Sequence, residues 1–183
     1  MEFITTRFPD VIIIEPEIYK DHRGSFCESF NLKKFQDNVE NTNFVLEFES
    51  KSKKNTLRGL HYQSLPYAQS KLVGVSYGKV LDIIVDIQKN SPTFGEHLII
   101  ELSDENNRQL YIPKGYAHGF FVLSDNATMN YKLDNYYSQD NYTGINIFDV
   151  NLNIKIPVER KDILISEKDM ALPLFNQAIY FNK

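Results

Sequence analysis

One of the chain's four histidines stands in a run that otherwise has the composition of a buried strand. The stretch LRGLHYQ, residues 57–63, places Arg58 and His61 among apolar neighbours. A lone histidine in such a place is more often satisfied by hydrogen bonds within a sheet. It could instead be a general base, because a neutral imidazole can remove a proton from a substrate. The rest of the chain must decide between these two interpretations.

Several kinds of catalysis lack their usual sequence support. The chain has no G-x-S-x-G elbow, no P-loop and no G-x-G-x-x-G fingerprint, and its only thiol, Cys27, lies close to phenylalanines. General acid–base chemistry remains. A histidine base held by a carboxylate, a lysine that stabilises an oxyanion and a tyrosine that donates a proton together suit proton abstraction next to a carbonyl.

A metal centre is the next alternative. Metal sites in jelly rolls of the cupin type use two histidines one residue apart, a nearby acid and a later histidine. Here His61 is followed by Tyr62 and Gln63, so the second ligand is missing, while PKGYAHG at 113–119 supplies His118 at the later position. Two histidines without a carboxylate fall short of the three protein ligands that a zinc or iron site needs. We expect neither a metal nor another cofactor.

The totals describe a single ordinary globular domain spanning residues 1–183. The chain is 42% hydrophobic and 24% charged, with a net charge of −4 and one cysteine. The charge excludes the basic footprint of a nucleic-acid-binding protein, and the single cysteine excludes an internal disulfide. The longest apolar run near the start is Val11–Ile14, too short for a signal peptide or a membrane span. We therefore expect a cytoplasmic protein that binds neither membrane nor nucleic acid.

Short runs of β-branched and aromatic residues, separated by Gly, Asn, Asp, Ser and Pro, predict strands along most of the chain. The runs are 11–15, 24–30, 44–52, 57–63, 71–77, 79–88, 97–103, 108–112, 117–123 and 127–134. Gly78 and Asn126 suggest hairpin turns at 76–80 and 123–128. Helical spacing appears at 31–41, with Asn31 as the cap, and a second short helix is expected near 167–171. This pattern predicts an all-β jelly-roll sandwich or barrel with a few short helices.

Two strands carry information about a pocket. In KVLDIIVDIQ, residues 79–88, alternation puts Asp82 and Asp86 on one face, which must meet either solvent or a polar cavity. In residues 57–63, Arg58 and His61 are three apart and would point to opposite faces of a regular strand. If both enter one pocket, the strand must be irregular, and Gly59 is the natural place for a bulge.

Seven blocks in the same order resemble the dTDP-4-dehydrorhamnose 3,5-epimerase family, which are metal-free cupins that epimerise nucleotide-linked 4-keto sugars. The blocks are DHRGSFCESFN at 21–31, LRGLHYQ at 57–63, AQSKLVGVSYGKVLDIIVDI at 68–87, SPTFGE at 91–96, YIPKGYAHGFF at 111–121, YKLDNYYS at 131–138 and ISEKDMALPLF at 165–175. The resemblance covers nearly the whole chain and favours a functional His61. It also implies a homodimer.

The resemblance implies roles for particular residues. His61 would be the base that removes the proton from sugar carbon 3 or 5, with Asp169 as its partner. Lys71 would stabilise the enolate at the carbon-4 oxygen, and Tyr131 would donate a proton from the opposite face. Residues expected to shape the pocket or bind the nucleotide are Arg23, Glu28, Arg58, Gln63, His118 and Tyr137. Pairing of His118 with Asp82 is an equal alternative for that residue.

The chain departs from the family pattern where the nucleotide is expected to bind. The family reads close to F-V-Q-D-N-H-S before the histidine strand, whereas this chain reads FVLEFES at 44–50, with Leu46 and Phe48 in place of the two amides. Gly74, Met170 and Ser25 differ as well. Each lost amide would cost on the order of 1–3 kcal/mol of affinity for a ligand that it bound. A GDP-linked 4-keto hexose or heptose is therefore an alternative to a dTDP-hexose.

Three functional interpretations remain open. The leading one is epimerisation at carbon 3, carbon 5 or both, in the synthesis of precursors for bacterial surface polysaccharides such as capsule or lipopolysaccharide. A cupin isomerase that moves the keto group between carbons 3 and 4 is less favoured, because such enzymes typically pair two nearby histidines and Gln63 breaks the pair. A non-catalytic cupin that binds sugar nucleotides is the third.

Overall fold

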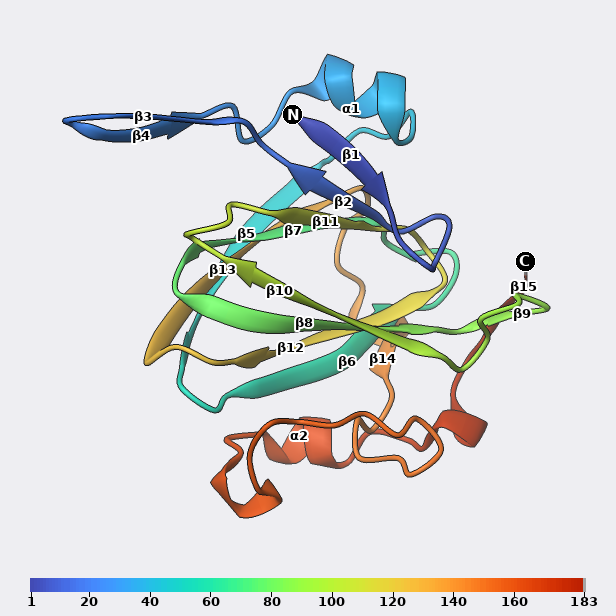
Figure 1. Cartoon of the computed structure of the whole chain (residues 1–183). Helices are drawn as coiled ribbons and strands as arrows, with labels where there is room; N and C mark the ends of the chain where they lie inside the picture. The colour runs from blue at the N-terminus through green and yellow to red at the C-terminus, as the bar shows by residue number, and fades with distance from the viewer. Residues whose placement is uncertain (183) are drawn as a thin grey trace.

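Two antiparallel sheets face each other in the computed structural model, which describes residues 1–182 (Figure 1). The six-stranded sheet has the order β1 (Glu2–Thr5), β2 (Ile12–Glu15), β11 (Gln109–Ile112), β7 (Lys71–Tyr77), β13 (Asn126–Leu133) and β5 (Leu46–Lys53). The five-stranded sheet has the order β10 (His97–Ser103), β8 (Lys79–Asp86), β12 (Tyr116–Val122), β6 (Leu57–Gln63) and β14 (Tyr142–Gly144). The predicted all-β jelly roll of the cupin type is confirmed.

The predicted elements match the structure closely where the hydrophobic pattern is strong. The strands β6, β7 and β10 have the predicted bounds. Helix α1 (Leu32–Asn38) begins after the predicted cap, because the Asn31 side chain accepts a hydrogen bond from the Lys34 backbone amide. Helix α2 (Glu167–Met170) lies where the second helix was expected. The pattern missed β1 and β14, together with β3 (Ile18–Asp21), β9 (Gln88–Lys89) and β15 (Phe181–Asn182).

Both predicted hairpin turns are wrong. The turn at Gly78 connects β7 to β8, and the turn after β12 leads into β13, so each connection passes from one sheet to the other. Gly78 does have the positive φ that its turn requires, +78°. A Cβ at Gly78 would overlap the Asn126 backbone carbonyl, so the two crossovers lie against each other. Turn residues alone could not show whether the next strand returns to the same sheet.

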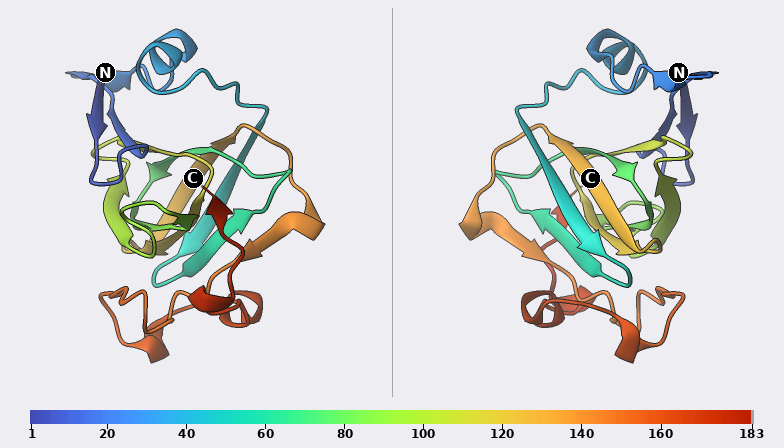
Figure 2. Two further views of the ribbon diagram at one scale, coloured as in Figure 1. Left: turned by 90° about the vertical axis from the view of Figure 1, so that its right-hand side faces the viewer. Right: turned by 90° about the vertical axis from the view of Figure 1, so that its left-hand side faces the viewer.

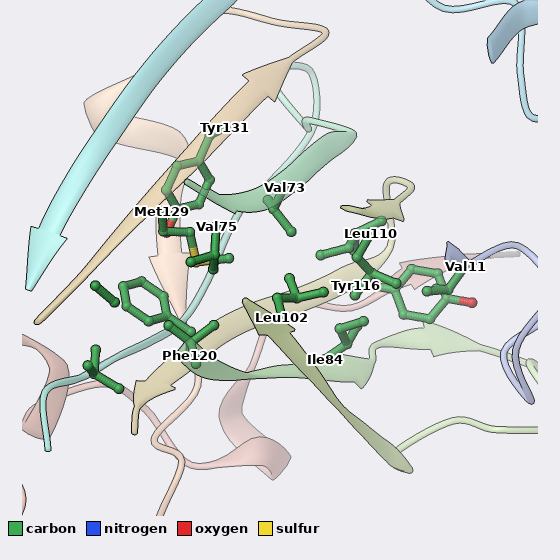
Figure 3. Packing of buried hydrophobic residues seen from close by; sticks show 14 of the residues in the cluster. Val11, Val73, Val75, Ile84, Leu102, Leu110, Tyr116, Phe120, Met129 and Tyr131 are labelled. Carbon is green, nitrogen blue, oxygen red and sulfur yellow. The ribbon is translucent and has the colours of Figure 1, made fainter. Parts of the chain in front are cut away.

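The main core fills the space between the two sheets (Figure 3). Val73, Val75, Met129 and Tyr131 point inward from the six-stranded sheet, and Ile84 and Phe120 with their neighbours point inward from the five-stranded sheet. A second core lies on the outer face of the five-stranded sheet, where the segment after β14 packs against Leu57, Leu60 and Ile83. The five-stranded sheet is therefore covered on both faces, which holds β6 firmly.

Two segments extend beyond the sandwich. Strands β3 and β4 (Gly24–Cys27) form a hairpin that projects away from the body (Figure 1). In both views of Figure 2, α1 lies at one end of the molecule and the coil that carries α2 lies at the other. Short 3₁₀ turns at Gln139–Asn141, Arg160–Asp162 and Phe175–Gln177 interrupt the later coil. None of the helices within residues 1–182 is long and apolar enough to cross a membrane.

Candidate active site

A cavity of about 550 Å³ opens between the two sheets, and both of them contribute side chains to it. Arg58 and His61 come from β6 and His118 from β12 of the five-stranded sheet, whereas Lys71 and Tyr131 come from β7 and β13 of the six-stranded sheet. The other lining residues are Leu46, Phe48, Ser50, Gln69, Gly119, Phe120, Leu133, Tyr137, Tyr142, Ser166, Lys168 and Asp169. The structure thus gathers most of the residues that the sequence singled out.

His61 and Asp169 form a hydrogen-bonded pair at the cavity wall. The His61 Nε2 atom lies 2.8 Å from Asp169 Oδ1, and the other carboxylate oxygen accepts a hydrogen bond from the Gly59 backbone amide at 3.2 Å. Ser166 caps α2 by accepting from the Asp169 amide. Burial alone would raise the pKa of Asp169, but the His61 hydrogen bond and the amide donors outweigh it and lower that pKa. The carboxylate therefore stays ionised, and its hydrogen bond to Nε2 sets the tautomer of the imidazole.

The predicted irregularity in β6 is present. Between His61 and Arg58 the strand advances three residues while its partner β12 advances two, from His118 to Phe120. Gly59, at φ +109°, takes up the extra residue. A Cβ there would lie 2.6 Å from the Gly119 Cα atom, which excludes any other residue at this position. The bulge lets Arg58 and His61 enter the same cavity.

A buried charge network supports the floor of the cavity. His118 Nε2 lies 2.7 Å from Asp82 Oδ1, and Asp82 is fully buried, so its carboxylate faces the interior rather than solvent. Burial lowers the pKa of Lys71 to about 8, although the Asp82 charge opposes the shift. The Lys71 ammonium donates to the His61 carbonyl oxygen at 3.1 Å. The pairing of His118 with Asp82 is confirmed, and because His118 also lines the cavity its contact with a substrate stays a prediction.

Tyr131 lies on the cavity wall opposite His61. It packs against Phe48, one of the residues that depart from the family pattern. Its ring stacks on Phe48 at a centroid distance of 4.5 Å and an interplanar angle of 20°. Burial raises the pKa of Tyr131 well above its usual value, so the phenol keeps its proton through the neutral range. Leu46 also lines the cavity. Both apolar replacements therefore lie where a ligand would contact them.

Gln63 was expected to shape the pocket or bind the nucleotide, and the structure corrects this expectation. Its side chain is buried and does not line the cavity. Instead, Nε2 donates to the carbonyl oxygens of Tyr67 at 2.6 Å and Tyr136 at 3.1 Å, and Oε1 accepts from the Ser138 amide at 2.7 Å. Gln63 therefore holds the loop that carries Tyr137, a cavity residue, instead of contacting a substrate.

Arg23 and Glu28 also lie outside the cavity of their own chain. Arg23 is on the projecting β3–β4 hairpin, where its guanidinium contacts Asp21 at 2.7 Å. Glu28, just after the hairpin, pairs with Lys34 at 2.7 Å. The Arg23 side chain is largely exposed, and the Glu28 side chain is a little under half exposed. Within a single chain, neither is positioned to contact a ligand bound beside His61.

Tyr142 and Lys168 are among the cavity-lining residues that the sequence motifs did not indicate. Tyr142 lies 5.2 Å from the His61 ring, centroid to centroid, and the Lys168 ammonium lies 4.6 Å from the centre of the Tyr142 ring. Lys168 could have been found from its place beside Asp169 in the ISEKD block. Tyr142 carried no signal, because the three-residue strand β14 is too short for a periodic pattern.

The arrangement can perform proton transfer at carbon. A histidine paired with a carboxylate stands on one wall, a protonated tyrosine stands on the other, and a buried lysine is available to stabilise an oxyanion. Within residues 1–182, no three His, Cys, Asp or Glu side chains are grouped so that they could hold a metal ion. Each cavity histidine is paired with its own carboxylate.

Residues 5–177 match the family of dTDP-4-dehydrorhamnose 3,5-epimerases. The chain belongs to this family. An enzyme of that name from Shigella flexneri is 50% identical over 182 residues, which are 99% of each chain. A dTDP-6-deoxy-D-glucose-3,5-epimerase from Legionella pneumophila, in complex with dTDP-4-keto-L-rhamnose, superimposes with a TM-score of 0.94 at 42% identity, covering 100% of this chain and 98% of that one.

A more distant member of the same fold has a narrower specificity. A 3'-monoepimerase from Streptomyces bikiniensis, in complex with dTDP-quinovose, has a TM-score of 0.87 at 29% identity, covering 94% of this chain and 87% of that one. Membership of the family makes the present chain an epimerase, and therefore an isomerase. The cavity between the sheets is its candidate active site.

Proposed function

We propose that the epimerase inverts carbons 3 and 5 of a dTDP-linked 4-keto-6-deoxy sugar without a metal. The observation that carries the proposal is the placement of the His61 base and the Tyr131 acid on opposite sheets, with the cavity between them. Epimerisation requires this geometry, because a proton must leave one face of a carbon and return to the other. The dTDP-linked sugars in the names of the relatives support the substrate class.

The steps follow from the positions of the groups. His61 takes the proton from a carbon next to the keto group, and the electrons of the broken C–H bond move to the carbon-4 oxygen. The Lys71 ammonium stabilises the enolate that forms there. Tyr131 then protonates the same carbon from the opposite face, and the keto group re-forms. The phenolate regains its proton from solvent, and His61 releases its proton, so the composition of the sugar is unchanged.

The charge at the cavity suits an anionic ligand. Arg58 and Lys168 are exposed cations that line it, and the Asp169 carboxylate is already paired with His61. We propose that these cations bind the diphosphate. The Arg58 guanidinium is oriented by a hydrogen bond from Nε to the Ser52 hydroxyl at 3.0 Å.

A GDP-linked 4-keto sugar is the second candidate substrate. Leu46 and Phe48 line the cavity in place of the amides expected from the family pattern, and this change favours a different contact with the base. The two nucleotides are alternatives for the same proton chemistry. The relation to the monoepimerase makes carbon 3 alone a further outcome to test.

We also propose that two copies of the chain form a homodimer in which each hairpin completes the partner's cavity. The hairpin that carries Arg23 projects from the body, and it exposes Tyr19 by 56% and Phe26 by 71%. Such exposed aromatic rings are typical of an interface. Because Arg23 and Glu28 do not reach the cavity of their own chain, a second chain is the simplest way to bring them to a ligand.

A mixing experiment tests the dimer. Refolding inactive His61→Asn with a weakened Arg23→Ala variant should restore up to about a quarter of wild-type activity, since half of the dimers then hold one intact site. Each variant refolded alone is the control. No recovery, together with a monomeric mass in sedimentation, would refute the shared site.

Hydrogen exchange in D2O tests the reaction. The epimerase is incubated separately with the dTDP-linked and the GDP-linked 4-keto-6-deoxy sugar, and NMR follows deuterium entry at carbons 3 and 5. We expect exchange at both carbons with the dTDP sugar, and its loss in His61→Asn. Exchange with the GDP sugar alone would establish the second candidate. Absence of exchange with both sugars would refute the proposed function.

A further inference from the structure

Tyr142 packs directly on the ring of the candidate base. It lies on β14, whose register with β6 places Tyr142 opposite Gln63 and Gly144 opposite His61. The His61 and Tyr142 rings are 5.2 Å apart between centroids, with 39° between their planes. Tyr142 is half-buried and lines the cavity. Tyr142 therefore packs against the imidazole as a tilted ring, whereas Asp169 contacts its Nε2 atom.

The same tyrosine also contacts the helix that supplies the carboxylate. The Lys168 ammonium lies over the Tyr142 ring at 4.6 Å, and Lys168 directly precedes Asp169 in α2. The Tyr142 ring also contacts the Tyr137 ring, with 5.6 Å between the centroids. Tyr142 thus joins three segments that are remote in sequence: the base strand, the carboxylate helix and the loop held by Gln63.

The other contacts of the pair hold the carboxylate more than the imidazole, because the Gly59 amide donates to Asp169 and Ser166 caps its helix, whereas the His61 ring is held by its hydrogen bond to Asp169. One hydrogen bond, from His61 Nε2 to Asp169 Oδ1, fixes one atom of the imidazole but leaves the ring free to tilt about that contact. Helix α2 has four residues, and one turn of helix is not stable by itself. An aromatic ring against the imidazole, and a cation–π contact to α2, restrict both motions.

We propose that Tyr142 is a positioning residue, whose ring holds the His61 imidazole and the Asp169 carboxylate in the geometry for proton transfer. This inference rests on the proposed epimerase function. The ring performs the positioning, and the hydroxyl is not required for it. Small errors in the placement of a base are costly, since rate depends steeply on the orientation of the reacting groups.

The test compares Tyr142→Phe, which keeps the ring, with Tyr142→Leu, which keeps only apolar volume. With the dTDP-linked 4-keto sugar, Tyr142→Phe should stay within about threefold of wild type, and Tyr142→Leu should lose about 10- to 100-fold in kcat with little change in KM. Tyr180→Leu is the matched control: it removes a ring from the aromatic cluster with Phe94 and Phe175, outside the cavity, and should leave kcat unchanged.

A double-mutant cycle tests whether the loss of activity in Tyr142→Leu arises through the His61–Asp169 pair. If Tyr142 acts through the pair, Tyr142→Leu should cost little more in a background of Asp169→Asn, because the aligned pair is already lost. Additive losses would overturn the proposal. A change in KM alone would do the same, because it would mark Tyr142 as a wall for the substrate.

A second measurement does not depend on the substrate. In ¹⁵N NMR of the full chain, the His61 ring should show one tautomer in wild type and in Tyr142→Phe, and mixed or broadened signals in Tyr142→Leu. Unchanged His61 signals in Tyr142→Leu would refute positioning. A wild type without any exchange activity, but with this NMR pattern, would refute the proposed reaction while the role of Tyr142 in holding the pair stands.

Discussion

The buried ammonium of Lys71 should limit activity at alkaline pH. Its pKa is lowered from 10.5 to about 8, chiefly by burial. The proposed reaction needs the protonated form to stabilise the enolate. With a pKa near 8, about one tenth of Lys71 is protonated at pH 9, so kcat/KM should fall about tenfold between its plateau and pH 9. A lysine with an ordinary pKa would lose almost nothing over this range.

Steady-state rates with the dTDP-linked 4-keto sugar, measured from pH 6.5 to 10, give this alkaline limb. Tyr131 and Tyr142 cannot produce it, because burial raises the pKa values of both. In Asp82→Asn the limb should move to lower pH, since the Asp82 charge raises the pKa of Lys71. A flat profile between pH 7 and 9.5, or a limb that Asp82→Asn leaves in place, would refute this reasoning.

The same group links stability to pH. Between about pH 8 and 10.5 the unfolded chain keeps the Lys71 proton that the folded chain has lost. The unfolded state then binds more protons, so stability rises with pH through this window. From pH 7.5 to 10, urea unfolding should show a gain of about 2 kcal/mol for wild type relative to Lys71→Met. An equal response of the two proteins would place Lys71 in a solvated environment.

Three further predictions concern the base and its supports. Asp169→Asn should lower kcat about 100-fold or more, because the amide can leave His61 in the wrong tautomer; kcat within threefold of wild type would contradict this. Because the pKa of Asp169 is lowered in the folded chain, wild type loses stability in acid, and Asp169→Asn should lose less. Gln63→Leu should raise KM more than it lowers kcat, by releasing the loop of Tyr137, whereas an unchanged KM would show that the loop holds without the amide. Gly59→Ala should destabilise the fold by about 3 kcal/mol or more in urea, since its Cβ would meet backbone atoms at 2.6 and 2.7 Å, and Gly24→Ala, also at positive φ but with nothing within 4 Å, is the control and should cost clearly less.

Some features of the site could be predicted from the sequence because they depend on local pattern. Alternation along β8 put Asp82 and Asp86 on one face, and both are fully buried. The spacing of Arg58 and His61 predicted the bulge at Gly59, because two side chains three apart can share a face only in an irregular strand. The cap at Asn31 was equally local.

What remained was decided by contacts between segments distant in sequence. Asp169 meets His61 across 108 positions, and the motifs alone gave this pairing only through the family resemblance. The Gln63 side chain lies outside the cavity and bonds to backbone groups of Tyr67, Tyr136 and Ser138. The two loops that carry these groups have no sequence pattern that would have placed them beside Gln63. Tyr142 lies on β14, a short strand with no sequence pattern of its own that is defined by its pairing with β6. The sequence by itself determined most of the strands and the chemical types of the proton-transfer groups. The distances between these groups, their burial and their shifted pKa values came from the tertiary structure, because these depend on which segments pack together.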